Sequence, residues 1–205
     1  RQYIDSWEKV SVKPGGTFQE PSVSMPMLSH YGPCGLYKYA LLIEKEGFEP
    51  LIEAAKIQER SGIALLSTKG MGTFAARDLV ERLSTDGVTT FVLHDFDQAG
   101  FTIARTLGDD TDVYKFNSDV NVIDMGFRLE DIHGLEREPV TYQTKADPEE
   151  SLLDAGVTQD EVDILVQDGR PGNWKGERVE LNAMTSGRLV ELIETKLERY
   201  GVQKV

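Results

Sequence analysis

The stretch from Val88 to Gly100 reads VTTFVLHDFDQAG. Its first six residues are apolar or β-branched, which is typical of a buried strand. Two aspartates, Asp95 and Asp97, follow directly, and apolar residues then recur at helical spacing from Ala99 to Leu107. A buried strand that ends in acidic residues and leads into a helix indicates a parallel α/β sheet.

The same alternation of strand and helix continues on both sides of this stretch. We predict strands at Tyr39–Ile43, Ile63–Leu66 and Val113–Phe116, and helices at Pro50–Arg60 and Thr73–Leu83. Such alternation requires crossover connections between parallel strands. The sequence therefore predicts a Rossmann-like α/β core, a parallel sheet flanked by helices.

The two ends of the chain differ from this core. Residues 1–36 form an irregular lead-in, because residues 11–35 are rich in glycine and proline. Residues 37–135 form the core, which includes an extended piece at 120–128, and residues 136–205 form a C-terminal extension. In the extension we expect a loop at 136–150, short helices at 149–155 and 159–167, and a terminal helix from Thr185 or Ser186 to Tyr200.

The chain has 205 residues, 40% of them hydrophobic, and a net charge of -13. This acidity argues against tight, nonspecific DNA binding by this segment alone, because phosphate backbones are bound by clustered Lys and Arg. No apolar run is long enough for a membrane span, and we expect no membrane partner. The single cysteine, Cys34, suits a reducing cytoplasm, where we place the protein together with the nucleoid. Since the chain begins at Arg1 rather than Met, we expect it to be a fragment.

Acidic residues follow two of the predicted strands at equivalent positions. Glu44 comes directly after the first strand, and Asp95 and Asp97 come after the third. Ligands of open parallel sheets bind outside the carboxyl ends of the strands. If these two strands are neighbours, the three carboxylates meet in one crevice, and Gly100 eases the tight turn into the next helix.

Three carboxylates without convincing His or Cys ligands favour a hard cation, Mg²⁺ or Mn²⁺, over zinc. Such an ion stabilises charge at a phosphodiester, and Glu44 could in addition move a proton at the leaving hydroxyl. The alternative is structural, because an Asp pair after a strand is often only a helix N-cap or turn. We interpret His94 as a strand-end residue rather than a metal ligand.

A glycine-containing loop with a lysine, STKGMG at residues 67–72, follows the second strand. Lys69 and the backbone N–H groups around Gly70 could face a phosphate, although the loop lacks P-loop spacing. Arg77, in the following helix, could extend the same positive face. A simple turn is the alternative interpretation of this loop.

These motifs together resemble a known family. IEKEGF at residues 43–48, STKG at 67–70 and LHDFDQAG at 93–100 resemble the Toprim domain of topoisomerase VI A subunits, which the meiotic double-strand-break proteins share. DMGFRLEDI at 124–132 and RVELNAM at 178–184 are similar to later segments of that family. Gln98 departs from the pattern, because relatives often have proline there.

The resemblance implies that Glu44, Asp95 and Asp97 hold magnesium, that Lys69 lies near DNA, and that Glu46 is an accessory acid. It also implies double-stranded DNA as substrate, a homodimer, and a further partner in the form of an ATP-binding B-type subunit. In that family the attacking tyrosine lies on a preceding winged-helix domain, and no tyrosine of this chain matches its motif.

Three functional hypotheses follow from the sequence. The first is magnesium-dependent cleavage, with rejoining as a further step, by a topoisomerase VI A-like enzyme. The second is a nuclease similar to the Toprim subunit of plasmid-defence complexes, in which water attacks. The third is a non-catalytic DNA-docking or structural module, and a small-molecule phosphatase is a distant further alternative.

Overall fold

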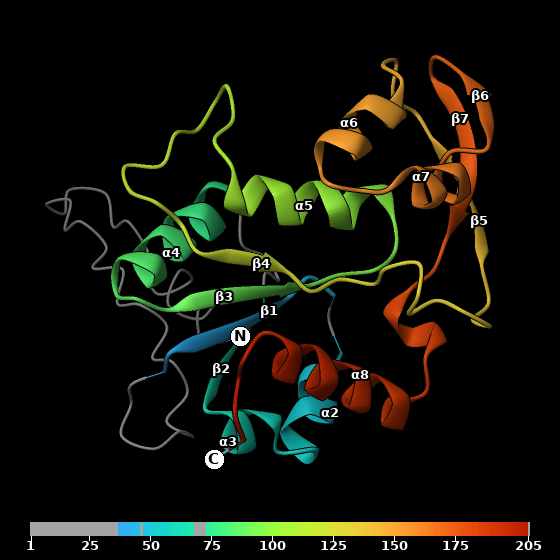
Figure 1. Ribbon diagram of the computed structural model, residues 1–205. Helices are drawn as coiled ribbons and strands as arrows, with labels where there is room; N and C mark the ends of the chain where they lie inside the picture. The colour runs from blue at the N-terminus through green and yellow to red at the C-terminus, as the bar shows by residue number, and fades with distance from the viewer. Residues whose placement is uncertain (1–36, 46, 68–72, 205) are drawn as a thin grey trace, which may run out of the picture.

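The computed structural model describes residues 37–45, 47–67 and 73–204, so the expected lead-in at 1–36 lies outside the described residues. A four-stranded parallel sheet stands at the centre, in the strand order β2-β1-β3-β4 (Figure 1). These strands are β1 (Tyr39–Ile43), β2 (Ile63–Ser67), β3 (Thr89–Leu93) and β4 (Val122–Asp124). The α/β fold with a flanked parallel sheet is confirmed.

The strands β1 and β3 are neighbours, and their ends are level. Ile43 lies opposite Leu93 on one side and opposite Ser67 on the other. The backbone N–H of Glu44 extends this pairing by donating to the carbonyl of Leu93 at 3.1 Å. The acidic segments after β1 and β3 therefore leave the same edge of the sheet side by side.

Helices cover both faces of the sheet because side chains alternate along a buried strand. Leu41 and Ile43 of β1 pack into one apolar cluster, and Ala40 and Leu42 into another. The helices α4 (Thr73–Thr85) and α5 (Gln98–Gly108) lie on the second face, whereas α2 (Glu49–Ala54), α3 (Ile57–Ser61) and α8 (Ser186–Arg199) lie on the first (Figure 1).

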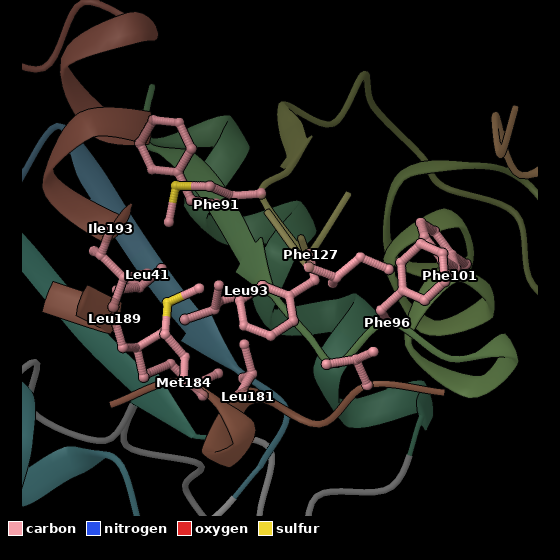
Figure 2. Close-up of a cluster of buried hydrophobic side chains, with 14 of the residues drawn as sticks. Leu41, Phe91, Leu93, Phe96, Phe101, Phe127, Leu181, Met184, Leu189 and Ile193 are labelled. Atoms are coloured by element: carbon pink, nitrogen blue, oxygen red, sulfur yellow. The ribbon is translucent and has the colours of Figure 1, made fainter. Parts of the chain in front are cut away.

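The terminal helix α8 has the expected position, with Thr185 at its N-cap. Its residues Leu189 and Ile193 point at Leu41 of β1 in the first cluster (Figure 2). The C-terminal extension therefore completes one face of the parallel sheet. In the described part of the chain, no helix is long and apolar enough to cross a membrane.

Three details of the sequence prediction are wrong. The helix expected at Pro50–Arg60 is broken into α2 and α3 by Lys56, which has φ 55°. The strand expected at Val113–Phe116 is absent from the described chain: Thr111 and Tyr114 form an isolated bridge, and Val113 is 79% exposed. β-branched and aromatic residues indicated a strand, but this segment closes a turn against α4.

The third error concerns residues 136–150, which contain a strand rather than a loop. A second sheet of three antiparallel strands has the order β5-β7-β6, with β5 (Glu138–Tyr142), β6 (Asp168–Arg170) and β7 (Asn173–Arg178). The edge position of β5 tolerates Pro139, which cannot donate to a ladder. Between β5 and β6 lie α6 (Pro148–Asp154) and α7 (Gln159–Leu165), close to the two short helices expected there.

Candidate metal centre

The three predicted acids gather at the carboxyl ends of β1 and β3. Burial, together with the negative charges of Asp97 and Asp95, raises the pKa of Glu44 from its ordinary 4.5 to about 7. Positive charge on His94 and Lys45 opposes this effect. Glu44 is therefore half-protonated near neutral pH, within the electrostatic reach of both aspartates.

Asp95 is held by contacts to both of its carboxylate oxygens, and it is only 9% exposed. Its Oδ1 accepts the backbone N–H of Leu181 at 2.6 Å, and its Oδ2 lies 3.4 Å from the ammonium of Lys45. Lys45 also forms an ion pair with Glu180 at 2.6 Å. Burial raises the pKa of Asp95, and the Leu181 N–H and Lys45 partly offset that rise.

Asp97 serves as the N-cap of α5. Its backbone is extended, and its Oδ1 accepts the backbone N–H of Gly100 at 2.7 Å. The alternative prediction, that the aspartate pair only caps a helix, is therefore correct for one oxygen of Asp97, its Oδ1. A capping carboxylate still has a second oxygen, so the cap fixes the side chain in place without excluding a ligand role.

A segment distant in sequence closes over the Asp95–Asp97 turn. Phe96 and Val179 exchange two backbone hydrogen bonds, of 2.9 and 3.0 Å. This places Glu180 beside Lys45, and Arg178 in turn lies 2.8 Å from Glu180. The resemblance pointed to residues 178–184, but nothing in their spacing indicated that Glu180 would be a fourth acid at the site.

His94 lies under the acids, fully buried. Its Nδ1 is 2.7 Å from the carbonyl oxygen of Asp95, and its Nε2 is 2.9 Å from Oδ1 of Asp124. Burial alone would lower the pKa of His94, but the hydrogen bond and charge of Asp124 outweigh burial and raise it. Both partners can accept a hydrogen bond, so the raised pKa favours the form of His94 that donates from both ring nitrogens, and that form has no lone pair for a metal.

The structure explains the glycine at position 100 differently from the sequence prediction. Gly100 is the third residue of α5 and does not lie in a turn before the helix, and a Cβ there would collide with Nδ1 of His94. The absence of a side chain therefore makes room for the buried imidazole. Gly126, on the segment after β4, meets the other side of the same ring.

The remaining predicted site residues are either undescribed or placed elsewhere. Glu46, Lys69 and Gly70 lie outside the described residues. Contrary to expectation, Arg77 does not extend a positive surface, because it is 1% exposed and donates to the carbonyl of Asp109 at 2.6 Å. Its guanidinium stacks on the rings of Tyr114 and Phe116.

The donor set fits a hard divalent cation in its chemistry. All of the acids provide carboxylate oxygens. Burial first, and then the negative charges of Asp97 and Asp95, raise the pKa of Glu44, and a bound cation would favour its charged form. In the described part of the chain, no three His, Cys, Asp or Glu side chains are already grouped as ligands. Lys45 holds Oδ2 of Asp95, so a cation at that oxygen competes with the ammonium of Lys45.

Comparison with known proteins assigns the fold and its motifs to one family. Over residues 39–197 the chain matches the family described as the Toprim domain of Topoisomerase 6 A subunits and Spo11. No curated protein matches the chain. The matched range includes both acidic segments and ends within α8. The chain therefore belongs to the Topoisomerase 6 A/Spo11 family of Toprim domains, which are related to DNA cleavage.

Proposed function

We propose that this chain is the Toprim half of a topoisomerase VI A-like active site, which cleaves DNA phosphodiester bonds with Mg²⁺, or Mn²⁺ in its place. The half-buried position of Glu44 against Asp97 and Asp95 carries this proposal, because it raises the pKa of Glu44 to about 7. Toprim domains generally bind a divalent metal, typically Mg²⁺. A partly buried cluster of carboxylates is suited to such an ion.

Glu44, Asp95 and Asp97 would hold the ion. When bound, the ion supplies positive charge against the phosphate oxygens and the departing oxygen. Glu44 is suited to move a proton, because a pKa of about 7 lies near the working pH of most enzymes. The segment from Arg178 to Leu181, which we call the strap, holds the side chain of Asp95 in place through the backbone N–H of Leu181.

The attacking group should come from outside the described residues. The charge of Asp97 affects the pKa of Tyr142. Burial, and to a smaller extent this charge, raise the pKa of Tyr142 to about 12. A phenol with that pKa is almost fully protonated at neutral pH and is a poor nucleophile. Because no tyrosine of this chain matches the motif of the family either, we assign attack to water or to a tyrosine of another domain. The partners that we propose are a second copy of the protein and either a B-type subunit or the components of a defence complex.

Supercoiled plasmid tests this function. We expect the full-length protein to nick or linearise it with Mg²⁺ or Mn²⁺ but not with EDTA. Asp97→Asn should lose this cleavage, although asparagine is as good an N-cap as aspartate, so the helix end is preserved. Asp86→Asn, at an exposed position beyond α4, is the matched control and should cleave like the wild type.

The same reaction separates the candidate mechanisms. Denaturing the protein during cleavage should trap a covalent protein–DNA adduct if a tyrosine attacks, and free ends if water attacks. Equal cleavage by Asp97→Asn and wild type would contradict the assignment of the acids. Absence of any metal-dependent cleavage by the wild type would favour a non-catalytic DNA-docking module.

A further inference from the structure

One lysine lies between the proposed metal site and the strap. The ammonium of Lys45 is 3.4 Å from Oδ2 of Asp95 and 2.6 Å from Oε2 of Glu180. Lys45 directly follows Glu44 in the sequence, so this cation belongs to the same edge of the sheet as the three predicted acids. Two carboxylates therefore share one ammonium, and Glu180 holds it at the shorter distance.

The strap fixes the position of Glu180 from both sides. Val179 exchanges two backbone hydrogen bonds with Phe96, and the N–H of Leu181 donates to Oδ1 of Asp95. Val179 and Leu181 are fully buried, whereas Glu180 is partly exposed and has an extended backbone. Neighbouring side chains of an extended segment point to opposite sides, so the carboxylate of Glu180 is directed away from the core. The ammonium that it binds is therefore held at a fixed place beside Asp95.

Arg178 balances the charge of Glu180 independently of the lysine. Its guanidinium lies 2.8 Å from Oε1 of Glu180, while Lys45 contacts the other oxygen. Arg178 also pairs with Glu138 of the small sheet at 3.0 Å. Because Glu180 would stay paired without the lysine, its own negative charge has little direct effect at Asp95. The influence of Glu180 on Asp95 should therefore pass through Lys45.

Lys45 and a divalent cation would compete for the same oxygen of Asp95. Oδ1 of Asp95 already accepts the N–H of Leu181, and Oδ2 is the oxygen that faces the ammonium. Lys45 can leave Asp95 and still keep a charged partner, because an ammonium has three donors and Glu180 accepts one of them. Without Glu180, the ammonium would have Asp95 as its remaining partner and would pair with it more fully.

We infer that Glu180 is a positioning residue of the metal site and that it acts through Lys45: it holds the ammonium away from Asp95 and so leaves Oδ2 open to a divalent cation. The inference rests on the proposed function, because it takes Asp95 as a metal ligand. Lys45 is then a resident counter-ion, which neutralises Asp95 in the metal-free protein and moves onto Glu180 when a metal binds.

Isothermal titration of the metal-free, full-length protein with Mn²⁺ at pH 8 tests this inference. Lys45→Met removes the competing charge and should bind Mn²⁺ about tenfold more tightly than the wild type. Glu180→Gln should bind it about tenfold more weakly, because the ammonium turns to Asp95. In the double variant the effect of Glu180→Gln should shrink to less than about threefold relative to Lys45→Met, since no ammonium remains to be held.

The opposite signs of the two single variants separate positioning from a purely structural role. If the pair of Lys45 and Glu180 only braced the strap, both variants would lose the same brace and both would weaken metal binding. That result, or an affinity unchanged in either single variant, would overturn the inference. Equal losses from Glu180→Gln with and without Lys45 would make Glu180 a direct ligand, which overturns it as well.

The matched control is Glu177→Gln, which removes another ion-paired acid of β7. Glu177 pairs with Arg137 at 3.3 Å, and this variant should bind Mn²⁺ like the wild type. A tenfold loss in this control would mean that only net charge matters. Urea denaturation in EDTA checks that each variant is folded. If Glu180→Gln is not, Glu180→Asp replaces it, because the shorter acid holds the ammonium less closely and should also weaken binding.

The wild-type titration separates failure of the inference from failure of the proposed function. No binding of Mn²⁺ by the wild type would remove both. Binding by the wild type, together with Lys45 and Glu180 variants of unchanged affinity, would remove the inference alone and leave the proposed function standing.

Discussion

Glu44→Gln is expected to lower plasmid cleavage by at least about 100-fold, and at the same time to stabilise the metal-free protein at pH 8. Cleavage falls because glutamine has no negative charge to hold the metal ion. It also cannot take up and release a proton as Glu44 does. Stability rises because glutamine removes a half-buried charge that is repelled by Asp97 and Asp95. Opposite changes in activity and stability distinguish a functional acid from a structural one.

The pH dependence of this effect follows from the raised pKa of Glu44. Its folded value of about 7 exceeds its ordinary 4.5, so between these values the folded state binds more protons than the unfolded state. Wild-type stability should therefore fall as pH rises through this window, and the whole penalty is present above about pH 7. Because Glu44 is partly exposed, we expect a gain for Glu44→Gln of only about 1–2 kcal/mol at pH 8 and little at pH 4.5.

Urea denaturation in EDTA at the two pH values measures this difference. Glu53→Gln, on the exposed surface of α2, is the matched control and should change neither cleavage nor the pH dependence of unfolding. If Glu44→Gln destabilised the protein at pH 8, Glu44 would be making net favourable contacts in the fold. Its position against the aspartates could then no longer carry the proposed function.

Gly126→Ala is expected to destabilise the protein by at least about 3 kcal/mol. A Cβ at this position would lie 2.2 to 2.4 Å from three atoms of the His94 ring, much closer than van der Waals contact allows. The ring cannot move aside, because Asp95 and Asp124 hold both of its nitrogens and Phe101 lies against it at 4.9 Å between centroids. The new methyl group therefore displaces either the buried imidazole ring or the chain that follows β4.

Gly187→Ala provides the matched control for this change. Gly187 lies in the first turn of α8, and a Cβ there meets nothing within 4 Å. Alanine should stabilise this helix by up to about 1 kcal/mol, because glycine is the poorer helix former. Urea denaturation compares both variants with the wild type. A change of less than about 0.5 kcal/mol for Gly126→Ala would mean that His94 is not clamped as described.

The sequence predicts the arrangement of the acids because short-range patterns determine it. The β-branched run before His94 indicates a buried strand, and the alternation with helices requires a parallel sheet. Parallel strands bring their carboxyl ends to one edge, so the proximity of Glu44 to Asp95 and Asp97 follows from topology. The capping role of Asp97 was one of the two interpretations that its position allowed.

Contacts between segments that are distant in the sequence could not be predicted from local sequence patterns. Leu181 reaches Asp95 through its backbone N–H, which any residue except proline provides, so no side-chain pattern marks that contact. Arg77 looked like a surface cation on a helix, but the aromatic rings of Tyr114 and Phe116 cover it from a turn that resembled a strand. The small sheet was missed because its strands are polar on the outward face and interrupted by glycine and proline.

Isothermal titration of the metal-free protein with Mg²⁺ and Mn²⁺ tests most directly whether Glu44, Asp95 and Asp97 form a metal site. At pH 8 we predict saturable binding in or below the millimolar range, and loss of it in Glu44→Gln and Asp97→Asn. Below pH 7 the affinity should fall by up to about tenfold per pH unit, because Glu44 must lose its proton to bind. No binding by the wild type up to about 10 mM metal, or equal binding by both variants, would contradict the assignment of these acids to a metal site.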